Sequence, residues 1–367
     1  MSDLAGLRAE LPVLERTAYL NAGTQGPLPR RAVAAARAEL EAELAEGRGT
    51  ARHFERIAAL AESLRAGVAP LLGCEPAEVA LTRSTTDGIN TALGALALGP
   101  GDEVLTSDEE HPGLVAPLAA ARARRGFSVR VAPFERVVEE VSARTRLVAC
   151  SHVSWVSGRV IDAPALAWVA RGAGARVLLD GAQGLGALAL DVRALGCDFY
   201  AAPGQKWLCG PDGSGYLYAR GDLAAELLPS WPSFVCLADP GRPEDLVLKP
   251  GATRFDQGVV ARAQAAASLA SLETLGEAGW DAVLARGPEL AEQLAARLAA
   301  HGASVTARGS STLVSWAADD GPIEVERLAA AGFVLRDLPG RGLVRASVGA
   351  WVSEEELERL VEAVGRR

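Results

Sequence analysis

The chain has 367 residues, of which 49% are apolar and 23% are charged, a composition typical of a folded globular protein. Its formal net charge of −9 argues against nucleic acid or an anionic membrane as a partner, because both attract basic surfaces. No window reaches the roughly 20 apolar residues of a membrane helix, and residues 1–16 have no apolar secretory core. We therefore expect a cytoplasmic protein with no membrane partner.

Strand-like and helix-like runs alternate through the first two thirds of the chain. Residues 31–70 have helical periodicity, and the alternation extends from about residue 77 to residue 220. Strands are predicted over 103–107, 127–134, 146–154, 176–182, 197–202 and 214–220, and helices over 114–125 and 163–171. The nearly continuous apolar run 146–154 is typical of a strand buried on both faces. The pattern predicts an α/β fold with a mainly parallel sheet between helices.

The last third has a different organisation. Residues 221–262 are rich in proline and glycine and are predicted to be irregular. A long helix is predicted over 262–300, a strand near 312–316, and a terminal helix capped by Ser353 with Glu356 three residues later. We therefore predict a smaller α+β C-terminal domain beside the α/β domain.

The predicted boundaries are a large domain over residues 15–260 and a small domain that consists of residues 261–367 together with the N-terminal residues 1–14. The five cysteines are scattered between them, and no two have Cys-x-x-Cys spacing. This pattern predicts neither a zinc site nor a disulfide framework, so we expect no metal. The cysteines are interpreted as small buried apolar residues.

Lysine is rare in this chain. Of 37 basic residues, only Lys206 and Lys249 are lysines. A sequence so rich in arginine retains lysine most readily where arginine cannot serve. A lysine amine can be desolvated into a nucleophile and can form a Schiff base, whereas a guanidinium stays protonated. Lys249 precedes a proline in a polar stretch, but Lys206 lies in a tight, glycine-flanked segment, which favours a chemical role for Lys206.

Polar residues follow the predicted strands where ligands bind in open α/β sheets, beyond the carboxyl ends. Threonines in RSTTDGIN precede a helix, whose first backbone amides and hydroxyls could hold a phosphate. The phosphate loops GxxxxGK[ST] and strand-linked GxGxxG do not occur in the chain. The candidates at the strand ends are Thr85, Thr86, His111, Trp155, Asp180, Gln183 and Lys206.

The order and spacing of these residues resemble a known family. DGAQ, with a lysine 26 residues after its aspartate in PGQKWLCGPDGSGYLY, resembles class V aminotransferases, which are fold-type-I pyridoxal 5′-phosphate (PLP) enzymes and include cysteine desulfurases. The tryptophan in SHVSWVSG and the start LNAGTQGPLP resemble the cystine or cysteine-conjugate C–S lyases and isopenicillin-N-epimerase-like proteins. Other matching segments are YLNAGTQGPLP (19–29), EEHPG (109–113), SHVSWVSG (151–158) and VRASVGAWVSEEE (344–356).

The resemblance implies the cofactor and the roles of individual residues. Lys206 would hold PLP as a Schiff base and later act as a proton-shuttling base. Asp180 would pair with the pyridine nitrogen, and His111 would stack on the ring. In addition, Gln183 would donate to the phenolic oxygen, Thr85, Thr86 and Gln205 would hold the phosphate, Trp155 would line the cofactor site, and Arg336, Arg345 and Gln25 would bind the amino-acid substrate.

Three positions depart from the pattern of this family. Many members have asparagine where this chain has Trp155, serine or threonine at Pro203, and threonine at Val259. We therefore expect modest cofactor affinity unless other donors compensate. The resemblance also implies a homodimer with active sites near the subunit interface. Trp231, Phe234 and residues 251–259 are candidates to reach the partner subunit, although contacts within the chain are an equal alternative.

The reaction is left open between several chemistries. The leading hypothesis is β-elimination from cystine, a cysteine S-conjugate or cysteine sulfoxide, giving pyruvate and ammonia through aminoacrylate. Aminotransfer or epimerisation is the alternative. A persulfide-type desulfurase needs a nucleophilic cysteine, which residues 336–344 lack, and Cys236 could serve only if its loop covers the cofactor. A non-catalytic protein of the same fold is the remaining hypothesis.

Overall fold

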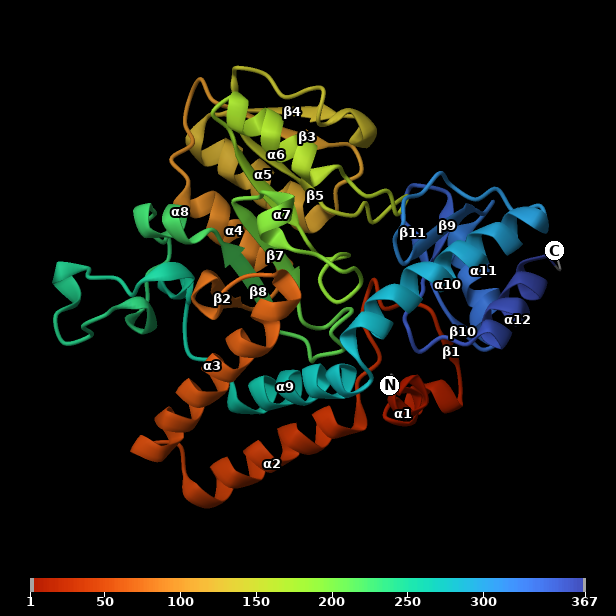
Figure 1. Cartoon of the computed structure of the whole chain (residues 1–367), viewed down its shortest axis with the longest axis horizontal. Helices are drawn as coiled ribbons and strands as arrows, with labels where there is room; N and C mark the ends of the chain where they lie inside the picture. Colours follow the sequence, from red (N-terminus) through yellow and green to blue (C-terminus); the bar gives the residue numbers. More distant parts are fainter. Residues whose placement is uncertain (1–2, 366–367) are drawn as a thin grey trace.

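The computed structural model describes residues 3–365, and its centre is a seven-stranded sheet with helices on both faces (Figure 1). The strand order is β2-β8-β7-β6-β5-β3-β4. β8 is antiparallel to both of its neighbours, and the other pairs are parallel. The strands are β2 (Val79–Thr82), β3 (Glu103–Ser107), β4 (Ser128–Ala132), β5 (Thr145–Ser151), β6 (Arg176–Asp180), β7 (Phe199–Pro203) and β8 (Gly215–Ala219). The predicted α/β fold with a mainly parallel sheet is confirmed.

Both faces of the sheet are buried. Successive side chains of a strand point to opposite faces, and on β6 Val177 and Leu179 pack with α3, α6 and α9, whereas Leu178 packs with α4, α5 and α8. Burial on two faces explains why these strands are continuous apolar runs. The helices around the sheet are α3 (Ala51–Leu72), α4 (Thr85–Ala95), α5 (Pro112–Arg125), α6 (Ala163–Gly172), α7 (Val192–Leu195), α8 (Gly221–Glu226) and α9 (Arg262–Glu277).

The predicted elements differ from the structure mainly at their ends. The helical stretch 31–70 is two helices, α2 (Arg30–Glu46) and α3, because Gly47 ends the first with a φ of 78°. Thr50 then caps α3, since its hydroxyl accepts a hydrogen bond from the His53 backbone N–H at 3.2 Å. The predicted strands 146–154 and 176–182 end earlier, because the residues after Ser151 and Asp180 turn toward the site.

The prediction of one long helix over 262–300 is wrong. The segment is α9 followed by α10 (Trp280–Ala300), and Gly279 between them has a φ of 92°, which the right-handed helix does not allow. α9 lies beside α2 along one edge of the molecule, and α10 leads into the C-terminal part (Figure 1).

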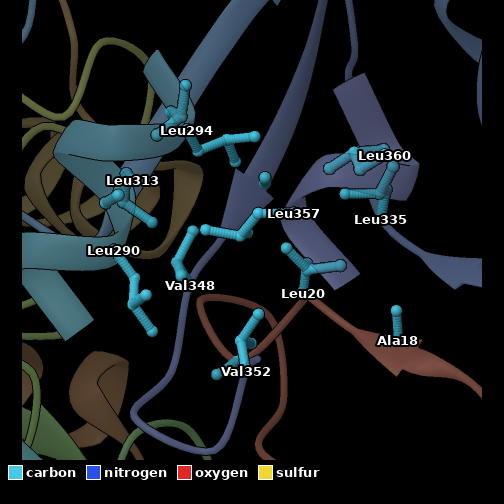
Figure 2. Packing of buried hydrophobic residues seen from close by; sticks show 14 of the residues in the cluster. Ala18, Leu20, Leu290, Leu294, Leu313, Leu335, Val348, Val352, Leu357 and Leu360 are labelled. Atoms are coloured by element: carbon cyan, nitrogen blue, oxygen red, sulfur yellow. The ribbon is translucent and has the colours of Figure 1, made fainter. Parts of the chain in front are cut away.

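The C-terminal part has its own sheet and core. Its antiparallel sheet has the order β11-β12-β9, and Leu290, Leu313, Val348 and Leu357 lie in one apolar cluster (Figure 2). Leu7, from the N-terminal helix, joins this cluster. The remaining elements are α1 (Leu4–Ala9), β1 (Ala18–Tyr19), β9 (Leu313–Ala317), α11 (Gly321–Ala330), β10 (Phe333–Val334), β11 (Arg336–Leu338), β12 (Leu343–Ser347) and α12 (Glu354–Gly365), with 3-10 turns at Pro12–Glu15, Pro76–Glu78, Phe134–Arg136, Phe234–Cys236, Pro243–Asp245 and Gly251–Phe255.

The predicted cap of the terminal helix is present. Ser353 donates its backbone N–H to Glu356 at 2.7 Å, and the Glu356 N–H donates to the Ser353 hydroxyl at 3.2 Å. The domain boundaries at residues 14, 15, 260 and 261 stay a prediction. Among residues 3–365, no helix combines the length and apolar character needed to span a membrane.

The strand order creates a crevice that positions the site. β3 leads through α5 to β4 on one side, whereas β5 leads through α6 to β6 on the other side. The chain therefore leaves the adjacent strands β3 and β5 in opposite directions at their carboxyl ends. In open α/β sheets, ligands bind at such a switch point.

Candidate active site

A cavity of about 220 Å³ lies at the carboxyl ends of the central strands. It brings together residues that are far apart in the sequence, from the start of α4, from the ends of β3, β5, β6 and β7, and from the strands β11 and β12. Ten of the eleven predicted site residues line it, namely Thr85, Thr86, His111, Trp155, Asp180, Gln183, Gln205, Lys206, Arg336 and Arg345. The predicted contacts between these residues and a ligand stay predictions, but their convergence on one cavity is observed.

Gln25 is the predicted residue that the structure does not bring to this cavity. Its side chain is exposed, and its backbone carbonyl accepts a hydrogen bond from the Tyr19 hydroxyl at 3.0 Å. The turn places Gly23 and Thr24 at the cavity wall instead. Sequence reasoning also missed Ser84, which lines the cavity and could have been found as the residue before the Thr-Thr pair.

Lys206 lies in the turn that follows β7. The chain approaches this turn closely, since a Cβ atom on Gly26 would lie 2.0 Å from the Lys206 carbonyl oxygen. Desolvation lowers the pKa of Lys206 to about 8, with smaller contributions in the same direction from the positive charges of Arg345 and Arg336 and an opposing one from Asp180. Near neutral pH, Lys206 therefore has far more free amine than an exposed lysine.

Asp180 ends β6 with a buried carboxyl group. Burial raises its pKa, and Lys206 and a hydrogen bond from the Ala182 N–H at 2.9 Å act in the opposite direction. The neighbouring Gln183 is held at both ends of its amide. Its nitrogen donates to the Gly23 carbonyl at 2.8 Å, and its oxygen accepts from the Trp207 indole at 3.0 Å. One amide hydrogen of Gln183 remains for a ligand.

The N-terminus of α4 faces the cavity. Ser84 caps this helix by accepting a hydrogen bond from the Asp87 N–H at 3.1 Å. The first-turn amides and the hydroxyls of Thr85 and Thr86 provide donors of the kind that bind a phosphate. The Gln205 amide also reaches the cavity, and its NH2 group can donate to an anion, whereas its buried oxygen has no partner among the described residues. This polar end of the cavity is suited to an anion.

His111 and Trp155 form one wall of the cavity. Their rings meet edge to face, with centroids 5.0 Å apart and planes at 85°. The His111 Nδ1 accepts a hydrogen bond from the Gly113 N–H at 3.0 Å, so the proton of the neutral ring lies on Nε2. Burial, with Lys206 and the two arginines of the cavity, lowers the pKa of His111 to about 4. The ring is therefore neutral at physiological pH.

Arg336 and Arg345 are cross-strand partners on β11 and β12. Arg345 is only 1% exposed, and its Nη1 donates to the Trp155 carbonyl at 2.8 Å. Its Nε and Nη2 are buried without a partner, and neither arginine forms an ion pair within the described part of the chain. Burial, together with the smaller effect of the positive charge of Arg336, lowers the pKa of Arg345 to about 9. Two adjacent cations that form no ion pair indicate a site for an anionic ligand.

The Arg336 side chain completes this part of the cavity. Its Cζ lies 5.6 Å from the centroid of the Trp155 ring, a cation–π contact, and its Nη1 lies 3.3 Å from the Thr24 hydroxyl. Trp155 therefore contacts His111 at its edge, Arg336 through its ring and Arg345 through its carbonyl. The tryptophan links the cofactor-side and arginine-side walls of the cavity.

The donor set fits the PLP group that the sequence resemblance implies. The cavity offers an amine for the aldehyde, a buried carboxyl group for the pyridine nitrogen and an aromatic face for the ring. It also offers a helix N-terminus for the phosphate and two polar atoms without a partner among the described residues, the Trp155 indole nitrogen as a donor and the Gln205 amide oxygen as an acceptor. Pro203 and Val259, two of the positions that depart from the family pattern, do not line this cavity. Pro203 ends β7, and Val259 lines a second cavity of about 310 Å³.

Cysteine is absent from the described residues that line the Lys206 cavity. Cys236, the one candidate on the irregular segment, is buried, and its thiol donates to the Ser233 carbonyl at 2.8 Å. The loop that carries it does not place this thiol at the Lys206 cavity. The other buried cysteines are Cys150, Cys197 and Cys209.

Comparisons with known proteins agree with this geometry. The family model "Aminotransferase class-V" matches residues 18–314. A probable cysteine desulfurase of Methanothermobacter thermautotrophicus is 30% identical over 297 residues, which are 78% of this chain and 74% of that protein. The isopenicillin N epimerase of Streptomyces clavuligerus is 29% identical over 377 residues, which cover 94% of this chain and 93% of that protein.

Solved structures of the cystine C–S lyase C-DES are similar over nearly the whole chain. Its complex with the reaction product cysteine persulfide has a TM-score of 0.91 and 29% sequence identity, and the match covers 97% of this chain and 99% of that one. A C-DES mutant with glycine covalently linked to the PLP cofactor has a TM-score of 0.92, also at 29% identity. The chain therefore belongs to the class-V aminotransferase family, and it is a PLP-dependent enzyme.

Proposed function

We propose that this enzyme catalyses β-elimination from a sulfur-containing amino acid. Cystine, a cysteine S-conjugate or cysteine sulfoxide would be cleaved at its C–S bond, giving pyruvate and ammonia. The observation that carries the proposal is the chemistry of the cavity. Its described lining residues offer one amine and two guanidinium groups without an ion pair, but no thiol. Such a cavity can hold an amino acid and move its Cα proton without accepting sulfur on the enzyme.

Lys206 is the proposed base. PLP, when bound, makes the Cα proton of an attached amino acid acidic, because the ring withdraws electrons. The lowered pKa of Lys206, about 8, leaves a useful fraction of its amine free to take that proton near neutral pH. Asp180 would hold a proton at the pyridine nitrogen, and His111 would cover the ring face. Thr85, Thr86 and Gln205 would hold the phosphate.

Arg345 is the proposed receptor for the substrate carboxylate. Its Nη1 is committed to the Trp155 carbonyl, which leaves Nε and Nη2 as the two unpartnered donors. These two N–H groups form one edge of the guanidinium and match the two oxygens of a carboxylate. Arg336, directly across the strand pair, supplies a second positive charge at the same place. A carboxylate bound there would relieve the repulsion between the two cations.

The leaving group would depart with the electron pair of its C–S bond. From cystine, the departing fragment would be cysteine persulfide, and the three-carbon remainder would hydrolyse to pyruvate and ammonia. No keto-acid acceptor is needed for this reaction. The similarity to C-DES, whose product is cysteine persulfide, supports this substrate class.

A desulfurase reaction through an enzyme persulfide is less well supported, although cysteine desulfurases are among the relatives. That route needs a cysteine thiol at the cofactor, and none of the described residues that line the cavity is a cysteine. Epimerisation or aminotransfer is the second candidate. It is favoured by the similarity to isopenicillin N epimerase over 94% of this chain.

A panel of substrates separates these reactions. The purified enzyme is incubated with cystine, S-substituted cysteines, cysteine sulfoxide, cysteine, and alanine plus a keto acid. We expect pyruvate and ammonia in equal amounts from cystine-like substrates without an added acceptor. Pyruvate that requires a keto acid would support aminotransfer, and loss of optical activity without pyruvate would support epimerisation; either result would refute elimination. Cys236→Ser is the control, and it should keep the full rate.

The anchoring amine is tested separately. Borohydride reduction of the yellow enzyme, followed by peptide mass analysis, should find the cofactor on the peptide that contains Lys206. Lys206→Ala should bind PLP only without a reducible link. If this variant retained wild-type levels of covalently fixed cofactor, the proposed site would be wrong, whatever the substrate panel gives.

A further inference from the structure

The crevice between the carboxyl ends of β3 and β5 holds a buried carboxyl group that the proposed reaction does not use. The two strands pair over Glu103–Leu105 and then diverge toward the active site. Glu110, on the loop after β3, fills the gap between them, and its residue is only 6% exposed. The next residue in the chain is His111, which forms the wall of the cavity.

Glu110 connects the two strand ends through neutral donors. One of its carboxyl oxygens accepts a hydrogen bond from the Ser151 backbone N–H at 3.0 Å and a short one from the Ser107 hydroxyl. The other oxygen accepts from the Ser151 hydroxyl at 2.6 Å. Ser107 ends β3 and Ser151 ends β5. The Glu110 side chain therefore connects the two strand ends where backbone hydrogen bonds between the diverging strands have stopped. We call Ser107, Glu110 and Ser151 the crevice clasp.

The crevice clasp adjoins both sides of the proposed cofactor site. Ser151 is the ladder partner of Asp180 on β6, and the next N–H, that of His152, donates to the Asp180 carbonyl at 2.9 Å. On the other side, Glu110 precedes His111, the residue that caps α5. A shift of the Glu110 carboxyl group would therefore move His111 and Asp180 relative to each other.

The preceding glutamate strengthens the same connection. Glu109 accepts hydrogen bonds from the hydroxyls of Ser154 and Ser157, the latter at 2.6 Å, on either side of Trp155. The two glutamates thus attach the loop of His111 to the loop of Trp155. The edge-to-face contact of His111 and Trp155 is therefore supported by hydrogen bonds of these carboxylates to the neighbouring serines, and not by apolar packing alone.

Glu110 has an unusual electrostatic setting for a buried carboxylate. Within the described residues it forms no ion pair, and the titratable groups that face it are Asp180 on β6 and Cys150 on β5. Burial and, to a smaller extent, the negative charge of Asp180 raise the pKa of Glu110 to about 7, although the serine donors oppose the rise. A charged Glu110 is costly for folding, so its presence calls for another reason.

We propose that Glu110 is a positioning residue of the active site. It joins the ends of β3 and β5 and thereby fixes the positions of His111 and Asp180 relative to each other for cofactor binding. This inference rests on the proposed roles of those two residues. It deepens them, because Glu110 itself does not line the cavity and acts through its neighbours.

The chain provides a matched control at the other end of the same strands. Glu103 begins β3, is 4% exposed, and accepts a hydrogen bond from the hydroxyl of Thr145, the first residue of β5, at 3.2 Å. It thus makes the same kind of strand-to-strand contact as Glu110, but at the edge of the sheet away from the cavity. Glu103→Ala and Glu103→Gln therefore test what the loss of a buried glutamate does without a nearby active site.

The experiment compares Glu110→Ala and Glu110→Gln with the two Glu103 variants in the full-length enzyme. For each, PLP is titrated into cofactor-free protein to obtain its dissociation constant, and the absorbance of the bound cofactor is followed from pH 5 to pH 9. Rates are measured on the active substrate of the panel. Circular dichroism verifies that every variant is folded.

We expect Glu110→Ala to weaken PLP binding and to lower kcat by roughly 10-fold to 100-fold, with a smaller change in KM, because misplacing groups at a reacting centre by about 1 Å has effects of this size. Glu110→Gln keeps an acceptor for Ser107 and Ser151, so it should restore most of kcat. It should also remove a step near pH 7 from the absorbance titration, because an amide does not ionise. The Glu103 variants should change neither quantity.

Two results would overturn the inference. Glu110→Ala could retain the wild-type PLP affinity, absorbance titration and kcat, or Glu103→Ala could alter them to the same extent as Glu110→Ala. Failure of the proposed function is distinguishable from either result. If the wild-type enzyme binds PLP on Lys206 but does not eliminate, the PLP affinity and the absorbance titration still test Glu110.

Discussion

The two ends of the β3–β5 strand pair use the same residue type in opposite ways. At the amino end, Glu103 lies 3.2 Å from a guanidinium nitrogen of Arg130 and 3.5 Å from one of Arg144. These contacts hold the pKa of Glu103 below its usual value, against the effect of burial. At the carboxyl end, Glu110 receives only hydroxyl and amide donors, and its pKa rises to about 7.

The difference separates stability from function along one strand pair. A buried carboxylate with cationic partners is stabilised in its charged form, so Glu103 contributes to folding. A buried carboxylate near another carboxylate is destabilised in that form, so Glu110 costs stability. The same contrast holds for the buried arginines, because Arg65 binds Asp256 whereas Arg345 has no anion. Uncompensated charge gathers at the carboxyl end, where the cofactor and substrate supply the missing partners.

The largest effect expected at the carboxyl end is on Lys206. Lys206→Ala should lower the elimination rate by roughly 10²-fold to 10⁴-fold, because the base that moves the Cα proton is removed. The thermal unfolding midpoint of the cofactor-free variant should change little, since the amine that is lost is desolvated in the folded state and contributes little to stability. Single-turnover kinetics and thermal unfolding of the same preparation measure both. If Lys206→Ala lost stability but kept its elimination rate, the carboxyl end would serve folding and not function, contrary to the comparison above.

The second prediction contrasts two buried arginines. Arg345→Met should lower kcat/KM by about 100-fold, because the edge that binds the substrate carboxylate is lost. It should change the unfolding free energy of the cofactor-free protein little, because the lost hydrogen bond to the Trp155 carbonyl is offset by the removal of a buried cation that has no ion pair. Arg65→Met, the control, should destabilise the fold by about 3–5 kcal/mol, since it leaves Asp256 buried without its cation. Chemical denaturation of both variants tests this, and equal losses would contradict it.

The third prediction concerns the pH dependence of stability. The pKa of Glu110 rises from an ordinary 4.5 to about 7 on folding, so the folded state binds more protons than the unfolded state between these values. Stability therefore falls as pH rises through this window, by at most about 3 kcal/mol at 1.36 kcal/mol per pH unit. Glu110→Gln has no carboxyl group to ionise and lacks this loss. Its thermal unfolding midpoint, relative to that of wild type, should therefore increase from pH 5 to pH 8. Thermal scans of cofactor-free protein measure the gain, and a pH-independent difference would be evidence against it.

The smallest effect is expected at the amino end. Glu103→Gln should lower the unfolding free energy by about 1 kcal/mol at pH 7, because it removes the charge that attracts Arg130 and Arg144. The stabilisation by ionised Glu103 is present above the unfolded pKa and is lost as pH falls through the lower folded pKa. The deficit should therefore shrink in acid. Denaturation at pH 7 and pH 4 measures it, and any change in kcat would count against the separation of the two ends.

Much of the large sheet could be predicted because its strands are apolar on both faces and end in polar turns. The break at Gly279 was missed, because alanine-rich flanks on both sides of one glycine have uninterrupted helical periodicity. Gln25 was expected at the substrate because it lies in a matching segment. In the structure, a turn held by the Tyr19 hydroxyl exposes that side chain, and local pattern does not reveal the direction of a side chain in a turn.

The amino-acid sequence alone determined that a rare lysine, an aspartate and a histidine follow buried strands, because burial and strand ends leave local patterns. Only the tertiary structure decided that Arg336 and Arg345 face each other without an ion pair among the described residues, and that Glu110 joins two diverging strands. These features depend on which strand ends become neighbours in the sheet. The charge that a buried group retains depends on the partners that the folded chain brings to it, and those partners are distant in sequence.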